Sequence, residues 1–106
     1  MKLPGQTFWL DIPNEPTPHL WIVLTDPGID CVIVMLTDAR NLLAPQFTIA
    51  AGTQFTPQVR TSKDSTVNFE RARMCGYASL DQIFNRSGRD AGVCNAQLLS
   101  TIRAEL

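Results

Sequence analysis

The stretch LWIVLTDPGIDCVIVML, residues 20–36, decides the fold class of this chain. It contains two apolar runs, Leu20–Thr25 and Cys31–Leu36, which are too short for typical helices and rich in valine and isoleucine. Because the apolarity of both runs is continuous rather than alternating, we expect both faces of each strand to be covered. The DPG triplet at residues 26–28 has the composition of a turn. The sequence therefore predicts a buried central hairpin in a closed or tightly coiled sheet.

Strand signals also flank this hairpin. Thr7–Ile12 is rich in aromatic and branched residues and predicts a first strand. Three prolines between residues 13 and 18 predict an exposed loop, because proline removes a backbone donor and fixes φ. After the hairpin, Phe47–Ala50 predicts a short strand, and Thr53–Ser62 is expected to be irregular.

The stretch Thr66–Met74 predicts a strand with a defect in it. Its apolar residues alternate at Val67 and Phe69 and then change phase toward Ala72 and Met74. A change of phase within one strand is typical of a bulge or a bend.

The last third of the chain carries helix signals. Ser79 with Gln82 fits a capping box, so we expect a short helix from about Leu80 to Asn85. Asn95 is a good N-cap for a last helix. The apolar residues after it have helical spacing: Leu98, Leu99, Ile102 and Leu106. Strands followed by helices predict an α+β domain with segregated elements.

Length and composition limit the class of protein. A chain of 106 residues with 44% hydrophobic content suits one globular domain. Its first residues lack the apolar segment of a signal peptide, and its apolar runs are too short to span a membrane, so we expect a cytoplasmic protein without a membrane partner. Three cysteines without a Cys-x-x-Cys spacing and a single histidine argue against a disulfide framework and a metal site, and no cofactor is expected.

Basic residues gather in the second half of the chain. The formal net charge is −1, so the molecule has no global basic field. Four cations nevertheless lie close together in the sequence and could form a local patch for phosphate: Arg60, Lys63, Arg71 and Arg73. The alternative, a solvated strand face, is favoured by charge alone.

Two polar residues flank the central hairpin. His19 precedes the first apolar run, and Thr37 follows the second. If the two strands pair antiparallel, both residues lie at the same end of the hairpin, where an imidazole could act as general acid or base beside a hydroxyl. The alternative is ordinary chemistry of strand ends and turns.

The two tryptophans, Trp9 and Trp21, carry large apolar side chains, and we expect both in the core. The position of Trp9 in the first strand leaves base stacking as the alternative.

Four stretches, taken in order, resemble the MazF/PemK-type toxins of toxin–antitoxin systems. PGQTFWLD at residues 4–11 resembles the family's opening, in which Gly-Asp precedes an aromatic strand. HLWIVLT at 19–25 resembles the strand that begins with Arg-Pro and runs apolar to Ser or Thr. VMLTD at 34–38 resembles the strand that ends in the family's Thr or Ser. Residues 64–74 and 79–83 resemble its late strand and the helix after it.

The resemblance implies a fold and a set of partners. The fold would be α+β and mostly β, with a small SH3-like antiparallel barrel over about residues 5–75. A short helix and a C-terminal helix would follow over about 79–106, within a single domain spanning residues 1–106. Such toxins are usually homodimers, and an antitoxin or another protein partner is implied.

The resemblance also implies an activity, the metal-independent cleavage of single-stranded RNA. In the family, an arginine at a strand start and a Thr or Ser at the next strand end carry the reaction, and by position these become His19 and Thr37. Histidine could take a proton from a ribose 2′-hydroxyl, but it lacks the permanent charge with which arginine stabilises phosphate.

Two hypotheses follow. In the first, the protein is a toxin-like endoribonuclease in which His19 acts as acid or base and Thr37 orients the scissile phosphate. The four cations would then bind RNA, with Arg71 or Arg73 offsetting the phosphate charge. In the second, it is a non-catalytic binding module of the same fold that acts through protein–protein contacts. The missing arginine favours the second hypothesis, and the basic cluster at residues 60–73 weakly favours the first.

Overall fold

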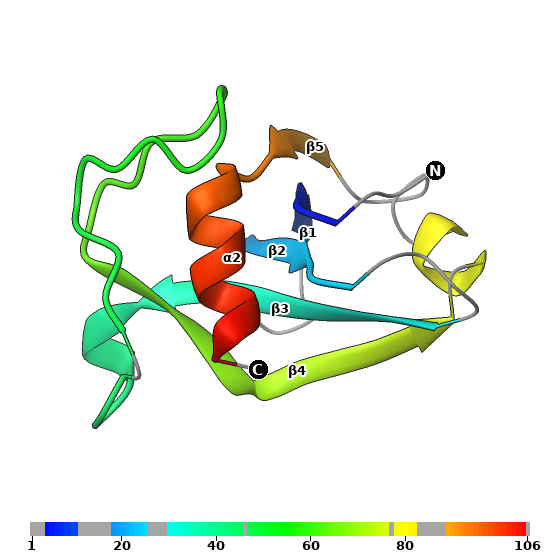
Figure 1. The fold of residues 1–106 in the computed structure, drawn as a ribbon, viewed down its shortest axis with the longest axis horizontal. Helices are drawn as coiled ribbons and strands as arrows, with labels where there is room; N and C mark the ends of the chain where they lie inside the picture. Colours follow the sequence, from blue (N-terminus) through cyan, green and yellow to red (C-terminus); the bar gives the residue numbers. More distant parts are fainter. Residues whose placement is uncertain are drawn as a thin grey trace.

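The computed structural model of the chain describes residues 4–10, 18–25, 30–45, 47–76, 78–82 and 89–105. It is a mostly β, α+β fold in which five strands are followed by a C-terminal helix (Figure 1). In chain order the elements are β1 (Gln6–Leu10), β2 (His19–Val23), β3 (Asp30–Asp38), the 3-10 turn η1 (Ala39–Asn41), β4 (Ser65–Gly76), a short helix at residues 78–82, β5 (Arg89–Val93) and α2 (Ala96–Ala104).

The strands form one antiparallel sheet in the order β4-β3-β2-β1-β5. At its centre β2 pairs with β3, and Ile22 lies opposite Val34. The predicted central hairpin is therefore confirmed. The DPG triplet at residues 26–28, predicted to form its turn, lies outside the described residues.

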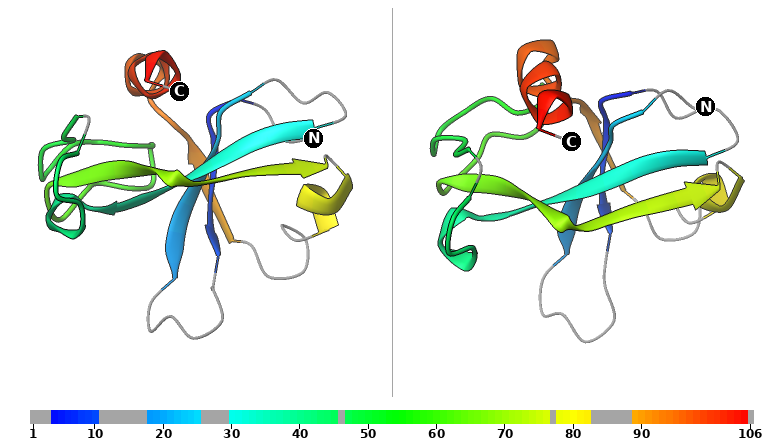
Figure 2. Two further views of the ribbon diagram at one scale, coloured as in Figure 1. Left: turned by 90° about the horizontal axis from the view of Figure 1, so that it is seen from below. Right: turned by 60° about the horizontal axis from the view of Figure 1, so that its bottom comes forward.

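Both faces of this hairpin are buried, as the continuous apolarity of its strands predicts. One face belongs to a main core in which Ile22 and Val34 pack together with Ile102 of α2. The other face belongs to a second core, where Trp21 and Met35 pack with Leu80 of the short helix. Figure 2 shows α2 lying to one side of the twisted sheet.

The expected closed barrel is not formed, because the sheet is open. In the described part of the chain β4 and β5 are the two ends of the strand order, and no pairing joins them. The physical reason lies in how the faces are covered. A barrel buries its inner face by closing on itself, whereas here α2 and the short helix each contribute apolar side chains to one face of the sheet.

The predicted defect in the late strand is confirmed in β4. Ile33 of β3 lies opposite Arg73, but Met35, two residues further along β3, lies opposite Asn68, five residues away on β4. This register shift accompanies the sharp bend of β4 in Figure 2. Met74, beyond the bend, is 74% exposed.

The strand β5 is missing from the sequence expectation, which assigned the region after residue 79 to helices and glycine breaks. Its sequence, RDAGV, has only two apolar side chains, Ala91 and Val93, which is too few for a clear strand pattern. Gly92 has a positive φ of 89° and lies opposite Thr7, where the β1–β5 register shifts. A glycine in such a conformation marks a bulge in a strand as readily as a chain break.

The C-terminal helix begins as predicted. Asn95 caps α2, because its side-chain oxygen accepts hydrogen bonds from the backbone N–H groups of Gln97 (2.9 Å) and Leu98 (3.4 Å). The capping box of the short helix is wrong, since residues 78–82 are helical and Ser79 already lies inside the helix. Residues 83–85 and Leu106 lie outside the described residues.

The segment between η1 and β4 contains only isolated bridges among its described residues. Ile49 pairs with Ser65, and Gln54 pairs with Arg60, in place of the short strand expected at residues 47–50. Two hydrogen bonds among the described residues join this segment to β5 and to the N-cap of α2. Thr56 Oγ1 donates to Ala91 O at 2.5 Å, and the Asn95 N–H donates to Phe55 O at 2.8 Å.

The remaining expectations concern chain ends and membranes. The first strand runs over Gln6–Leu10, and residues 11–17, with most of the expected proline loop, lie outside the described part. None of the described helices combines the length and apolarity that a membrane-spanning helix requires.

Candidate functional site

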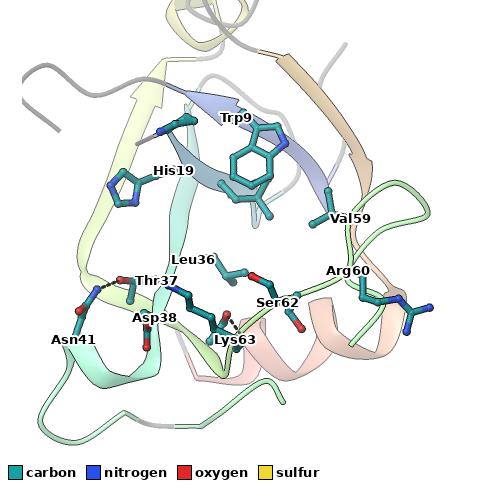
Figure 3. A pocket seen from close by; sticks show the side chains of 14 residues that line it. Trp9, His19, Leu36, Thr37, Asp38, Asn41, Val59, Arg60, Ser62 and Lys63 are labelled. Atoms are coloured by element: carbon teal, nitrogen blue, oxygen red, sulfur yellow. Dashed lines mark hydrogen bonds between the residues drawn. The ribbon is translucent and has the colours of Figure 1, made fainter. Parts of the chain in front are cut away.

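A cavity of about 480 Å³ lies where β2 begins and β3 ends (Figure 3). Segments that are distant in the sequence form its wall: β1, the two hairpin strands, η1, the stretch before β4 and the first residue of β4. The lining residues are Trp9, Pro18, His19, Leu20, Leu36, Thr37, Asp38, Asn41, Val59, Arg60, Thr61, Ser62, Lys63 and Ser65.

His19 and Thr37 both line this cavity, as the hairpin geometry predicts. The register of β2 and β3 explains the placement. Trp21 lies opposite Met35, and two further residues along each strand lead to His19 and Thr37. The sequence-based prediction that the two residues share one end of the hairpin is thus confirmed, while their catalytic roles stay predictions.

The hydroxyl of Thr37 is held by a residue that the sequence analysis did not single out. Asn41 Nδ2 donates a hydrogen bond of 3.0 Å to Thr37 Oγ1. A threonine hydroxyl has one proton to donate besides its lone pairs, so this contact leaves the Thr37 proton available to an anionic oxygen in the cavity. The spacing of four residues across a strand end was the only signal in the sequence.

Asp38 forms a fixed negative charge on the cavity wall. Its carboxylate accepts from the Arg40 N–H at 2.9 Å and from Arg40 Nη2 at 2.8 Å. The hydrogen bonds from Arg40 lower the pKa of Asp38 to about 2, and the positive charge of Lys63 acts in the same direction. Asp38 is therefore a carboxylate at neutral pH and has no proton to donate as a general acid.

The two predicted cations of the cavity point in different directions. Figure 3 shows the Lys63 side chain reaching toward Thr37 and Asp38. The Arg60 side chain is directed away from the cavity in the same view, and its Nη1 donates to Gly52 O at 3.0 Å. Lys63 is therefore the cation best placed to meet an anion bound beside Thr37.

Arg71 and Arg73 do not line this cavity. Both are exposed on β4, whose first residue, Ser65, lies at the cavity wall. A strand rises about 3.3 Å per residue, so six residues carry Arg71 up to about 20 Å from Ser65. The structure therefore divides the basic cluster that the sequence suggested.

Among the described lining residues, Trp9 is the only one of the phenylalanine, tyrosine and tryptophan type, and its indole accompanies the imidazole of His19. It is partly buried and packs against the main core. Neighbouring strands hold its backbone on both sides, with Leu20 of β2 and Arg89 of β5 as its register partners.

The cavity thus combines an imidazole, an oriented hydroxyl, an ammonium group and an indole ring. Such groups suit the binding of an anionic, aromatic ligand and the movement of a proton. In the residues that the structure describes, no group of three or more histidine, cysteine, aspartate or glutamate side chains is arranged to hold a metal ion.

Comparisons with known proteins give no relative for this chain. No protein-family model matches it, and neither the curated proteins nor the solved structures contain a significant match.

Proposed function

We propose that this protein is a metal-independent endoribonuclease that acts on single-stranded RNA, and that it is a divergent relative of the MazF/PemK-type toxins. The observation that carries the proposal is the meeting of His19, Thr37 and Lys63 in one cavity. They come from β2, β3 and the segment before β4, so only the folded chain brings them together.

Each of the three groups has a distinct part in the reaction. His19 takes the proton of a ribose 2′-hydroxyl, and the 2′-oxygen forms a bond to the adjacent phosphorus while the bond to the 5′-oxygen breaks. Water protonates the leaving oxygen, and the imidazolium returns its proton to solvent. Thr37 keeps its proton and donates a hydrogen bond from its hydroxyl to a non-bridging phosphate oxygen, which orients the phosphate. The products are a 2′,3′-cyclic phosphate and a 5′-hydroxyl end.

Lys63 compensates for the main difference from the toxin family, which is that His19 stands in place of an arginine. The family's arginine keeps a permanent charge, which a histidine in its place does not. Lys63 provides a cation in the same cavity, close enough for its charge to act on the pKa of Asp38. In this protein the roles of proton transfer and charge stabilisation are divided between two residues. The support for the proposal is thus the site rather than the sheet, which is open.

RNA cleavage in the presence of a chelator tests the proposal. The wild-type protein should cut mixed-sequence single-stranded RNA in excess EDTA and leave cyclic phosphate ends. His19→Ala should lower the rate at least about 100-fold, the usual scale for losing a general base. The exposed Arg103→Ala on α2 removes a distant positive charge and serves as the control. A wild-type protein that leaves RNA intact and does not arrest bacterial growth when induced contradicts the proposal.

A second candidate function is a non-catalytic module that binds a protein partner or another copy of itself. The exposure of apolar side chains on both edge strands favours it, since Met74 of β4 is 74% exposed and Val93 of β5 is 48% exposed. Open sheet edges are templates for pairing with another chain. Light scattering of the wild type against Met74→Lys tests self-association, and an antitoxin-type protein would be a partner for the same edges.

A further inference from the structure

We propose that Trp9 is the platform on which a nucleobase of the bound RNA stacks, next to the phosphate held by Thr37 and Lys63. This inference rests on the proposed function and adds the group that recognises the base. Recognition by stacking makes the ligand a nucleotide unit rather than a bare phosphate.

The location of Trp9 carries the first step of the argument. Its indole lines the same cavity as Thr37 and Lys63, and Figure 3 shows the ring across the cavity from them. Cavities of a few hundred cubic ångströms hold small organic ligands, and this one measures about 480 Å³. A phosphate at Lys63 and a base at Trp9 would therefore occupy opposite sides of one site.

The second step concerns rigidity. Trp9 lies on β1, between β2 and β5, and its ring packs against the main core. A stacking platform works best when its ring is already fixed, because little conformational entropy is then lost on binding. The backbone pairing and the core contact together provide that fixation.

The other tryptophan shows what a purely structural role looks like in this fold. Trp21 is 5% exposed and belongs to the second core, on the opposite face of the sheet. Within the described part of the chain its indole Nε1 is buried without a hydrogen-bond partner. Trp9, in contrast, is partly exposed and borders a cavity that the cationic side chain of Lys63 also lines.

The combination of an aromatic ring and a cation is the arrangement by which proteins bind single-stranded nucleic acids. The cation meets the phosphate, and the ring meets the base. Stacking on an aromatic side chain changes affinity by about tenfold or more per base and tolerates different bases. We therefore expect Trp9 to strengthen binding without imposing a strict sequence requirement.

A cycle of two probes and two proteins tests the inference. The probes are a short single-stranded oligodeoxynucleotide, which lacks the 2′-hydroxyl and is not cleaved, and an oligomer of the same length whose sugars carry no bases. The wild type should bind the first probe at least about tenfold more tightly than the second. Trp9→Leu should remove most of that preference and leave the affinity for the base-free probe unchanged.

Two further variants complete the design. Trp9→Phe keeps an aromatic ring and should retain part of the preference, and Lys63→Ala should weaken the binding of both probes by similar factors. The chain contains two tryptophans. The base-containing probe should therefore quench the emission of the wild type but not that of Trp9→Phe, in which Trp21 alone emits.

The possible outcomes distinguish a failure of the Trp9 stacking role from a failure of the proposed function on which it rests. If Trp9→Leu keeps the preference for bases, or loses affinity for both probes equally while still folded by circular dichroism, the stacking role is overturned. If the wild type binds both probes equally well, the stacking role is overturned and the phosphate site remains. If the wild type binds neither probe and cleaves no RNA, the proposed function falls and the stacking role falls with it.

Discussion

Asn41 Nδ2 donates to Thr37 Oγ1 at 3.0 Å, and this hydrogen bond ties the turn η1 to the end of β3 at the cavity wall. It fixes the direction in which the Thr37 proton can be donated. Asn41 is exposed, so its side chain contributes little to the core.

Asn41→Ala should therefore lower kcat for RNA cleavage by about tenfold and change KM little, because the hydroxyl loses its orientation rather than its presence. The free energy of unfolding should change by less than about 0.5 kcal/mol, as expected for an exposed side chain. Steady-state kinetics and urea denaturation measure the two quantities. Thr37→Ser should keep most of the activity and Thr37→Val should not, and equal activity of these two variants would contradict the role of the hydroxyl.

Lys63→Ala should weaken the binding of single-stranded RNA and reduce the slope of log K against log salt by about 1, since one phosphate contact is lost. Arg60→Ala should have a smaller effect, because the Arg60 guanidinium is bound to Gly52 O and directed away from the cavity. Fluorescence anisotropy at several salt concentrations measures both. A slope that does not change in Lys63→Ala would mean that Lys63 does not meet phosphate.

Asp38 should stay ionised far into the acidic range. Hydrogen bonds from Arg40 lower the pKa of Asp38 from 3.8 to about 2. The contribution of the pair to folding stability is therefore fully present above about pH 4 and is lost as the pH falls through about 2. Arg40 is exposed and Asp38 is only partly buried, so solvent screens the pair and we expect a small contribution. Titration of the side-chain carboxyl carbon by NMR should show this midpoint, and Arg40→Ala should shift it toward 3.8.

Cys94 should resist alkylation in the folded protein. Burial raises the pKa of its thiol to about 12, and its Sγ donates to Asn95 O at 3.4 Å. Only the thiolate reacts readily with iodoacetamide, so labelling at pH 8 should require unfolding. Because the folded state keeps a proton that the unfolded chain releases near pH 9, the free energy of unfolding should fall as the pH rises from about 9 to 12. Mass spectrometry with and without guanidinium measures the labelling, and rapid labelling of Cys94 in the native protein would contradict this prediction.

The central hairpin could be predicted because continuous apolarity in two short runs has few other solutions. The same pattern could not say how the faces would be covered. A closed sheet and an open sheet covered by helices bury the same strand residues, so the barrel was wrong although the hairpin was right. The strand β5 escaped prediction because its only buried residue in the main core is Ala91, and its pairing with β1 supplies what its side chains do not.

The candidate site, like the fold, could be predicted from the sequence only in part. His19 and Thr37 could be placed together because antiparallel pairing relates a strand start to a strand end. The four basic residues could not be sorted from sequence, because nearness along the chain does not reveal the direction of β4. Lys63 comes before the strand and reaches the cavity, whereas Arg71 and Arg73 are carried away along it.

The hydrogen bonds that join residue 55 to Asn95 and residue 56 to Ala91 affect the order in which the site forms during synthesis. His19 and Thr37 are synthesised early. The segment that includes Lys63 is held in place by Ala91 and Asn95, which are synthesised some thirty positions later. A nascent chain that has not yet released β5 and α2 therefore holds the two hairpin residues without a finished cavity. If the protein cuts RNA as we propose, we expect the growing chain to have no complete site until β5 and α2 have been made.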